Sequence, residues 1–397
     1  MPVELILAGN GPGELSGWIA PVARAARSAA GNDLRLTLAL SPSQFASGRE
    51  SDVVRGWNLF DRVLDPRTCL RVASGLQQVP VDDASALIHL GGDLWLSGRL
   101  AARLRIPACA LVETVLIARR HAAFRRIFAV SDALARQLAE RGVSPAKIVT
   151  TGDPRGDAMG TTPRAGTSPA ARGEDAFVVS ILPGSRDRVY TVLVPYFLRV
   201  AHALAAAVPD VRFNIIVSPY LSRDAVAAVR ADASRQWPSL ALKWVTEDGW
   251  AALAASDFVL TIPGTNTLEL AMLAIPFAVV VDTTLVPLAS MEGALEWITR
   301  VPGIGPALRR RVLMRYLARL RFASLPNIRL GRAVVPEWVG RWPPEELAKQ
   351  VAAWLQAPDK REALRRELQE TFALHPGAAQ AIASSALELA AARGRTR

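Results

Sequence analysis

Two glycine-rich turns lie in separate halves of the chain, and each follows an apolar strand pattern and precedes a helical pattern. The first occupies residues 5–17 and the second residues 178–186. A strand that ends in such a turn and leads into a helix presents unbonded backbone N–H groups and the positive end of the helix dipole, which suits a phosphate. Because the arrangement occurs twice, it predicts two Rossmann-like halves that face one cleft.

Length and composition agree with two domains. The chain has 397 residues, half of them hydrophobic, and a domain typically takes about 150 residues. The formal net charge is +11, from 47 Lys and Arg against 36 Asp and Glu. Such a charge predicts an acidic partner, which can be a phosphate, a nucleotide, a nucleic acid or an anionic membrane surface.

Cysteine content and targeting signals point to a cell compartment. Cys69 and Cys109 are the only cysteines in the sequence, and their separation favours neither a disulfide framework nor a zinc site, as expected in a reducing cytoplasm. Residues 1–4 lack the basic segment of a secretory signal. No uncharged apolar stretch approaches the roughly 18 to 20 residues that span a bilayer. We therefore expect a protein that is soluble or lies on a membrane surface.

Strand and helix patterns alternate along the first domain, residues 1–160. Strands are expected at residues 3–8, 34–40, 86–90, 108–112, 127–130 and 148–150, and helices at 19–29, 96–104 and 133–141. This alternation predicts an α/β domain with a parallel sheet covered on both faces. Residues 161–176, rich in Thr, Pro, Ala, Gly and Ser, are the expected linker.

The same rhythm restarts in the second domain, residues 177–375. Strands are expected at residues 177–182, 213–218, 242–246, 258–262 and 277–281, and helices at 195–207, 222–233 and 267–273. Pro195 suits the first position of its helix. The tail is predicted to be helical, and we expect its last helix, residues 376–397, to pack back on the first domain.

The alternation fails between residues 283 and 326, where we expect an insertion with a basic amphipathic helix at 306–321. Its leucines fall on one helical face and its arginines mostly on the other, as in helices that lie among the headgroups of an anionic membrane. An ordinary surface helix packed on its own domain gives the same pattern, so both interpretations stay open.

The sequence lacks the patterns of several catalytic classes. Its four histidines have no metal-pair spacing, and it contains no GxSxG elbow, no P-loop lysine and no Asp-x-Asp motif. Hydrolases, P-loop enzymes and metal-dependent transferases therefore lose support, and neither a metal nor another cofactor is expected. Arginines spread through alanine-rich helices without an aromatic platform also make a nucleic acid an unexpected partner.

The first glycine turn offers backbone and polar side chains to a ligand. Gly11, Gly13 and Gly17 allow a ligand close to the backbone, and either Glu14 or Ser16 can contact a polar substrate. The alternative is that this turn has a purely structural role, which would give the same sequence pattern.

The second turn adds a cation. After Gly184 and Ser185, Arg186 can hold a diphosphate with two hydrogen bonds and offset the charge that develops as a nucleotide leaves. The alternative is an arginine that only caps its loop.

A third turn, at residues 262–271, again joins a strand pattern to a helix pattern. Glu269 lies about one turn into the helix, where its carboxylate can accept hydrogen bonds from a ribose. The residues that can offer N–H groups, hydroxyls and an amide to a phosphate are Gly264, Thr265, Asn266 and Thr267. A helix cap with a solvated first-turn glutamate is the alternative.

Together these turns resemble the family of lipid-A-disaccharide synthases, which are nucleotide-sugar glycosyltransferases of the two-domain GT-B type. Residues 13–17 are similar to that family's Gly-Glu-Ala-Ser-Gly, residues 182–186 match its Leu-Pro-Gly-Ser-Arg, and residues 264–269 are similar to its Gly-Thr-Ala-Thr-Leu-Glu. Residues 325–337 contain counterparts of its Leu-Pro-Asn-Leu, Gly-Arg and Val-Pro-Glu in the same order.

The resemblance implies a UDP-sugar bound by the second domain and a lipid-linked sugar acceptor bound by the first. Arg186 would bind the diphosphate, Glu269 the ribose, and Asn327 would lie close to the nucleotide. The acceptor-binding residues implied in the first domain are Gly13, Glu14, Ser16 and Gly17.

Two carboxylates are candidates for the general base that deprotonates the acceptor hydroxyl. Asp93 occupies the place of the family's acidic residue after a first-domain strand, and Glu113 is the second candidate. Glu113 can instead be an acid that pairs with Arg119 or Arg120.

The first domain departs from the family pattern at three places. Trp18 replaces an acidic residue, residues 112–116 replace a Ser-Pro and Trp-Ala-Trp stretch, and Asp153 stands where the family has the histidine of Gly-His-Pro. Because the acceptor should bind here, the acceptor can differ from the family's acylated glucosamine phosphate.

We expect a metal-independent single displacement that inverts the anomeric centre, in a cytoplasmic protein peripheral on the inner face of the membrane. Two alternatives stay open. One is an enzyme like UDP-N-acetylglucosamine 2-epimerase, which needs no lipid acceptor, and the other is a membrane-surface binding protein without turnover.

Overall fold

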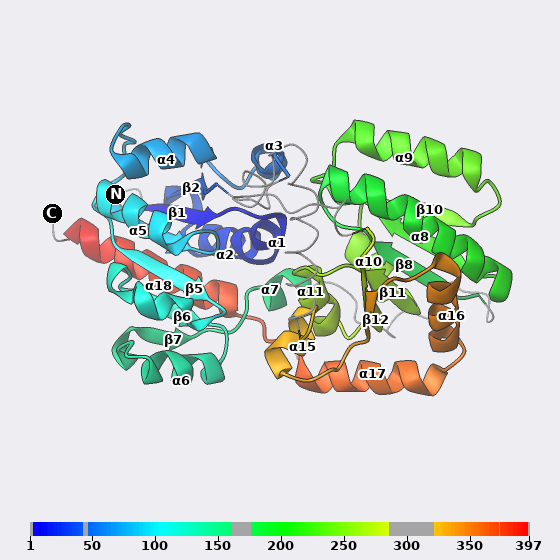
Figure 1. The fold of residues 1–397 in the computed structure, drawn as a ribbon. Coiled ribbons are helices and arrows are strands. Elements are labelled where there is room, and N and C mark those ends of the chain that lie inside the picture. Colours follow the sequence, from blue (N-terminus) through cyan, green and yellow to red (C-terminus); the bar gives the residue numbers. More distant parts are fainter. Residues whose placement is uncertain (1–2, 43–46, 161–175, 286–320, 373, 396–397) are drawn as a thin grey trace, which may run out of the picture. The chain divides into compact units, whose positions relative to one another are not determined.

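The computed structural model describes residues 3–42, 47–160, 176–285, 321–372 and 374–395 (Figure 1). The chain forms two compact units, one of Met1–Thr161 with Leu374–Arg397 and one of Thr162–Ala373. The predicted linker at 161–176 and the predicted basic amphipathic helix at 306–321 lie, apart from the last residue of each, outside the described residues.

The first unit is built on seven parallel strands in the order β3-β2-β1-β4-β5-β6-β7. In β1, Leu5 and Leu7 on one face are as deeply buried as Ile6 and Ala8 on the other. A parallel strand covered on both faces therefore has a continuous apolar run. The strands are β1 (Val3–Gly9), β2 (Leu34–Leu40), β3 (Arg62–Leu64), β4 (Ala84–His89), β5 (Ala108–Val112), β6 (Arg126–Ala129) and β7 (Ile148–Thr150).

Helices cover both faces of this sheet. On one face α4 (Pro66–Ser74) and α5 (Leu94–Leu104) enclose a core with Ile6 and Leu87, and on the other α2 (Ala20–Ala30) and α18 (Ala378–Arg395) contact one another (Figure 1). The remaining helical segments are α1 (Pro12–Glu14), a π-helical turn (Leu15–Ile19), α3 (Glu50–Gly56), α6 (Asp132–Glu140), α7 (Arg155–Met159) and short 3₁₀ turns at Gly31–Asp33, Val115–Arg119, His121–Ala123 and Pro145–Lys147.

The second unit repeats the design with six parallel strands in the order β10-β9-β8-β11-β12-β13. The strands are β8 (Val178–Leu182), β9 (Arg212–Ile216), β10 (Leu242–Val245), β11 (Phe258–Thr261), β12 (Phe277–Asp282) and β13 (Glu337–Gly340). The helices are α8 (Asp187–Ala207), α9 (Arg223–Gln236), α10 (Gly249–Ala254), α11 (Asn266–Met272), α15 (Leu325–Leu330), α16 (Pro344–Leu355) and α17 (Pro358–Thr371).

The start predicted for the helix at 195–207 is wrong. α8 begins at Asp187, so Pro195 lies inside the helix, where its ring cannot donate a hydrogen bond. The residues before the proline, including Val189 and Leu193, are buried, and α8 packs against α9 and α16. Tertiary packing therefore outweighs the local cost of the proline. Among the described helices, α8 is the one with the length and apolar composition of a membrane span. Its apolar residues are largely buried inside the second unit, which explains that composition.

The last helix returns to the first unit, as predicted, and the fold class of two Rossmann-like domains with that returning helix is confirmed. Asp157 in α7 holds the start of α18, because its two carboxylate oxygens accept hydrogen bonds from the N–H groups of Gly377 at 2.6 Å and Ala379 at 2.8 Å. A Cβ atom on Gly156 would lie 3.0 Å from the carbonyl oxygen of His375, so this junction also depends on a glycine.

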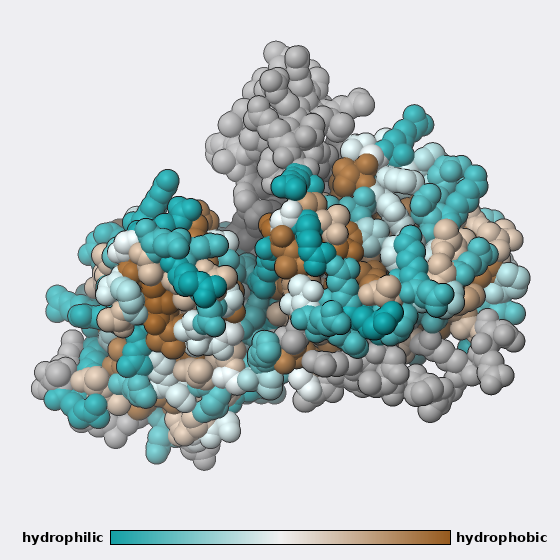
Figure 2. All heavy atoms as spheres, turned by 90° about the horizontal axis from the view of Figure 1, so that it is seen from below, coloured by the Kyte–Doolittle hydropathy of each residue, from teal (hydrophilic) through white to brown (hydrophobic). Residues whose placement is uncertain are grey.

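Charged and polar residues dominate much of the visible surface. On the face shown in Figure 2, hydrophilic residues cover both units, with hydrophobic residues in patches between them. The cysteines are inside: Cys69 and Cys109 are free, buried thiols, and burial raises the pKa of each to about 12. An ionised, reactive thiolate is therefore disfavoured at both positions.

The first prediction concerns the anchoring of α18. Asp157→Ala removes the acceptor for two N–H groups at the start of that helix and should lower the free energy of unfolding by about 1 to 2 kcal/mol. Urea denaturation followed by circular dichroism measures the change. The matched control is Glu388→Ala in the same helix, whose exposed ion pair with Arg126 should contribute less than about 1 kcal/mol. Equal losses in both variants would contradict the anchoring role.

The second prediction concerns His89, the buried last residue of β4, whose ring Nδ1 lies 2.9 Å from the Ser97 hydroxyl. Burial lowers the pKa of His89 to about 4, against the opposing effect of Asp93. Since the unfolded chain binds this proton at about pH 6.5, His89 should lower the free energy of unfolding by about 1.4 kcal/mol per pH unit as the pH falls from there towards 4. Denaturation of the wild type and of His89→Gln across this range should show a weaker pH dependence in the variant, and parallel curves would exclude the effect.

Candidate functional site

The candidate residues gather at one edge of each sheet, where the parallel strands end. In the first sheet the chain moves outward from β1 through β2 to β3 and then returns to β4 on the other side of β1. In the second sheet β8 and β11 have the same relation. Connections that leave neighbouring strands in opposite directions open a crevice at their carboxyl ends, which is where ligands bind in open α/β sheets. We call these places the first and the second switch point.

At the first switch point the Glu14 carboxylate joins the turns after β1 and β4. One oxygen accepts the backbone N–H groups of Asn10 at 2.9 Å and Gly11 at 3.2 Å, and the other accepts the N–H of Gly92 at 3.2 Å. Burial raises the pKa of Glu14, and these hydrogen bonds oppose that effect. A Cβ atom on Gly91, whose φ is +145°, would lie 2.2 Å from the carboxylate. The turn therefore needs a glycine at position 91, and Glu14 mainly shapes the backbone of the site.

Trp18 enters the site from a widened helical turn. In the π-helical turn Leu15–Ile19 the N–H of Ala20 bonds to the carbonyl of Leu15, five residues back. Pro21 cannot donate the next hydrogen bond, which allows the wider turn. The buried indole of Trp18 then donates from Nε1 to an Asp153 carboxylate oxygen at 2.8 Å.

A buried arginine lies next to that pair. Arg155, the first residue of α7, has a side chain that is only 1% exposed, and its guanidinium carbon lies 4.2 Å from the centre of the Trp18 ring. Its Nη1 donates to Asp153 at 2.9 Å and to Glu113, directly after β5, at 3.3 Å. The contacts combine a cation–π interaction with two ion pairs, in which the Glu113 side chain remains 30% exposed.

The structure separates the residues predicted for the first domain into different roles. Asp93 is exposed and caps α5, accepting the Leu96 N–H at 2.8 Å. Ser16 donates to the carbonyl of Pro12 in its own helix at 2.8 Å. Gly13 and Gly17 belong to the helix that follows β1.

Arg155 is the first-unit residue that sequence reasoning missed. The partner expected for Glu113, if it formed an ion pair, was Arg119 or Arg120, whereas the described ion pair is with Arg155. A single arginine after Gly-Asp-Pro matches no motif. Its one sequence signal is the neighbouring Asp153, at a position already recognised as a departure from the family pattern.

At the second switch point the turns after β8 and β11 lie against one another. Gly184 has φ +107°, and a Cβ atom there would lie 3.0 Å from the side chain of Ile262. The turn leads to Arg186, which is partly buried and occupies the N-cap position of α8 without capping it by a side-chain hydrogen bond. Arg186 thus lies at the start of a helix, directly after a turn that contacts the turn after β11.

The turn after β11 is ordered by its own side chains. The Thr267 hydroxyl donates to the carbonyl of Gly264 at 2.7 Å, and Asn266 donates its side-chain amide to the Thr261 hydroxyl. Thr265 is the N-cap of α11, and Glu269 one turn later is 5% exposed. The alternative of a solvated first-turn glutamate is therefore excluded by burial.

Asn327 of α15 and Glu337 of β13 are at the centre of a hydrogen-bonded network in the second unit. The Asn327 oxygen accepts from the N–H groups of Val334 and Val335, and its amide donates to the Val335 carbonyl and to Glu337. These four bonds use the full hydrogen-bonding capacity of the asparagine side chain. The structure thus gives Asn327 a scaffold role, in which it joins α15 to β13.

The same hydrogen-bonded network extends to α11. Glu337 also accepts from the N–H groups of Ala323 and Ser324, and Thr267 accepts the N–H of Leu325 at 3.1 Å. Three stretches that the sequence marks as motif segments, 264–269, 325–328 and 335–337, therefore form one hydrogen-bonded network in the second unit.

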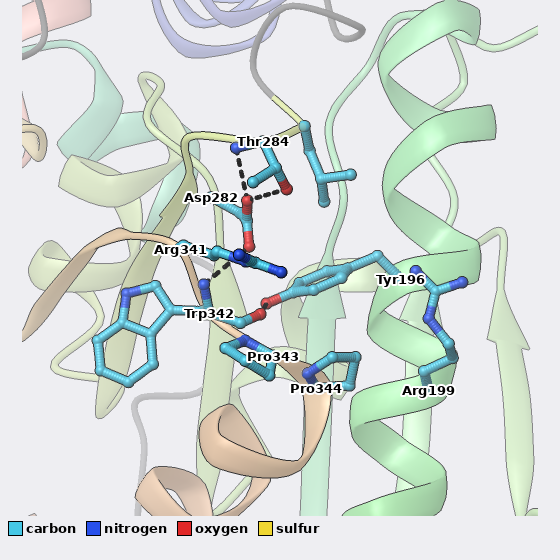
Figure 3. A pocket seen from close by; sticks show the side chains of 9 residues that line it. Tyr196, Arg199, Asp282, Thr284, Arg341, Trp342, Pro343 and Pro344 are labelled. Atoms are coloured by element: carbon cyan, nitrogen blue, oxygen red, sulfur yellow. Dashed lines mark hydrogen bonds between the residues drawn. The ribbon is translucent and has the colours of Figure 1, made fainter. Parts of the chain in front are cut away.

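A separate hollow of about 250 Å³ lies where β12 and β13 end (Figure 3). Asp282 accepts the backbone N–H groups of Thr284 and Trp342, while Tyr196 of α8 donates its hydroxyl to the Trp342 carbonyl. Arg341 and other described residues complete its lining, and none of the predicted site residues is among them. The contacts in Figure 3 hold the chain after β12 to the chain after β13.

The sequence is similar to lipid-A-disaccharide synthases. A family model described as lipid-A-disaccharide synthetase matches residues 156–289. The lipid-A-disaccharide synthase of Rhodospirillum centenum is 30% identical over 217 residues, which cover 54% of this chain and 46% of the relative. The enzyme of that name from Syntrophus aciditrophicus is 31% identical over 220 residues, 54% of this chain and 50% of the relative. The chain thus aligns with about half the length of these curated relatives.

Solved structures share the fold. UDP-N-acetylglucosamine 2-epimerase from Neisseria meningitidis bound to UDP-GlcNAc has a TM-score of 0.52 at 14% identity, covering 97% of this chain and 99% of that one. MurG from Acinetobacter baumannii has a TM-score of 0.51 at 14% identity, covering 98% of this chain and 100% of that one. At this identity the likeness shows the fold alone, and the predicted GT-B class is confirmed.

The predicted recognition is confirmed by the sequence matches: the chain is similar to lipid-A-disaccharide synthases over about half its length, and the family model matches residues 156–289.

Proposed function

We propose that this protein is a glycosyltransferase that moves a sugar from a UDP-sugar to a lipid-linked acceptor, in the manner of a lipid-A-disaccharide synthase. The observation that carries the proposal is the second switch point, where the turn with Arg186 follows β8 and the network of the three motif segments includes the start of α11 after the neighbouring strand β11. The sequence relatives, which are named for that activity, support it.

In this proposal the second unit holds the donor. Arg186 binds the diphosphate at the start of α8, while the first N–H groups of α11, which begins at Asn266, bind it from the neighbouring turn. Gly184 and Ser185, with Gly264 and Thr265, keep the backbone close to the ligand. Glu269 is the proposed ribose contact, and Asn327 acts through the shape of the loop because its own hydrogen bonds are made within the protein.

The first unit holds the acceptor in this proposal. A carboxylate at the carboxyl edge of the first sheet, Asp93 or Glu113, takes the proton of the acceptor hydroxyl as that oxygen attacks the anomeric carbon. UDP leaves from the opposite face of the sugar, so the reaction inverts the anomeric centre. Arg186 and the helix starts supply the positive charge that the departing diphosphate needs, and we propose that no metal takes part.

We propose a cytoplasmic protein peripheral on the inner face of the membrane, because a lipid-linked acceptor is reached from the membrane surface and the chain is strongly basic. The expected contact through residues 306–321 lies outside the described residues and stays a proposal. An epimerase-like enzyme would have the same fold, so the fold does not favour this alternative over the synthase. The sequence relatives favour the synthase. An epimerase would act equally without lipid, so dependence on detergent-dispersed lipid separates the two.

The third prediction concerns Arg186. With UDP-N-acetylglucosamine as donor and detergent-dispersed bacterial lipid as acceptor, Arg186→Ala should lower kcat/KM by about 10²- to 10³-fold, the size of effect found when one donor to a developing charge is removed. Release of UDP is the measurement. Arg199→Ala, an exposed residue farther along α8, is the matched control and should keep the wild-type rate. Full activity of Arg186→Ala would exclude the diphosphate role.

If the wild type releases no UDP with a series of UDP-sugars and lipids, the protein is instead a binding protein that keeps the transferase fold. Calorimetric titration with UDP then measures whether donor binding has survived.

A further inference from the structure

Three residues of the first unit, from segments that follow different strands, meet around one buried arginine. Trp18 comes from the helix after β1, Glu113 from the end of β5, and Asp153 from the chain before α7. They are far apart in the sequence, and each contacts Arg155. Because all three contact the same buried cation, we treat them with Arg155 as one cluster. This cluster lies at the edge that is proposed to bind the acceptor.

Arg155 is held on two sides. The Trp18 ring covers the guanidinium at 4.2 Å, and Asp153 accepts both the Arg155 backbone N–H at 3.1 Å and its Nη1 at 2.9 Å. The indole of Trp18 donates to the same carboxylate. With the ring on its face and the carboxylate at its side, the guanidinium has a fixed orientation and presents Nη1 to Glu113.

The anchoring of α18 does not account for this arrangement. The junction of α7 with α18 is held by Asp157 and by the close approach at Gly156, on residues other than Arg155. Burying a charged group is costly, and an apolar side chain of similar volume usually stabilises a core as well or better. A buried arginine that reaches a partly exposed carboxylate at a ligand edge therefore points to function.

Besides Asp153, three other carboxylates described at this edge are engaged differently. Glu14 binds backbone N–H groups of two turns, and Asp93 caps α5. Glu113 is 30% exposed and has a buried side chain, that of Arg155, as an ion-pair partner. A carboxylate with an exposed portion and a fixed partner is suited to contact a substrate hydroxyl in one orientation.

We propose that Arg155, clamped by Trp18 and Asp153, is a positioning residue that fixes Glu113 as the carboxylate contacting the acceptor hydroxyl. The inference rests on the proposed function and deepens it, because it selects Glu113 over Asp93 as the base. Glu113 takes the hydroxyl proton while the acceptor oxygen bonds to the anomeric carbon. The bond from that carbon to UDP breaks, and UDP leaves with its electron pair.

A mutant cycle tests whether Arg155 acts through Glu113. The variants are Arg155→Met, Glu113→Gln and their combination, assayed by UDP release with UDP-N-acetylglucosamine and detergent-dispersed bacterial lipid. We expect Arg155→Met to lower kcat by about 10²-fold, the effect of a small misplacement of a reacting group, with the KM for the UDP-sugar unchanged. In the Glu113→Gln background the same substitution should cost nothing further. Losses that multiply would overturn the proposal.

The control is a second ion pair of the same sheet. Arg62 pairs with the fully buried Glu4 near the start of β1, away from the switch point, so Arg62→Met should leave kcat unchanged. If Arg62→Met lowers kcat as much as Arg155→Met does, the effect of Arg155→Met is structural and the proposal fails. Should Arg155→Met not fold, Arg155→Lys replaces it in the cycle, because lysine keeps the charge but not the planar fork and should retain an intermediate kcat.

A readout without turnover separates this inference from the proposed function. The Trp18 indole N–H, identified in an ¹⁵N-correlated NMR spectrum by its loss in Trp18→Phe, should shift in Arg155→Lys and in Glu113→Gln but not in Asp93→Asn. An unchanged Trp18 signal in Glu113→Gln overturns the proposal even in an active enzyme. If the wild type releases no UDP, the proposed function fails, and the NMR result alone decides whether the clamp positions Glu113.

Discussion

The reversal of strand order beside β1 and beside β8 is the constraint on which the candidate site depends. Parallel strands bring all their carboxyl ends to one edge, and the reversal makes the turns after two neighbouring strands diverge there. At the first switch point Glu14 ties those turns together through three backbone N–H groups. At the second, Thr267 ties α11 to the start of α15. Side chains far apart in the sequence are thereby placed at one edge of their sheet.

The motif residues of the second unit divide into those that make hydrogen bonds within the protein and those that lie at the start of a helix. Asn327 donates a hydrogen bond to Glu337 and joins α15 to β13, so the presence of both residues in the motif segments reflects the shape of the loop. Arg186 lies at a helix start, where a charged ligand is favoured. A sequence motif names both kinds of residue together, and only the hydrogen-bond pattern separates them.

The sheet strands were predictable because a parallel strand buried on both faces is a continuous apolar run, as in β1 and β12. Two edge strands were missed. β3 has three residues and starts with Arg62, which forms an ion pair with Glu4. β13 starts with Glu337, which belongs to the hydrogen-bonded network with Asn327. Short strands that carry charged residues for such contacts lack an apolar run.

The positions of Arg186 and Asp93 were predictable because each residue stands in a turn after a strand, while their functional roles stay predictions. Arg155 could not be found in this way, since its role comes from Trp18, Asp153 and Glu113, which only the fold brings together. The start of α8 was misplaced for a related reason, because its packing on α9 and α16 outweighs the local effect of Pro195.

A crystal structure of the full chain with UDP is the most direct test of the central claim that the second switch point holds a nucleoside diphosphate. The account predicts a diphosphate within hydrogen-bonding distance of the Arg186 guanidinium and of the first backbone N–H groups of α11. A diphosphate bound away from both turns, or no bound nucleotide at a high concentration of UDP, would contradict it.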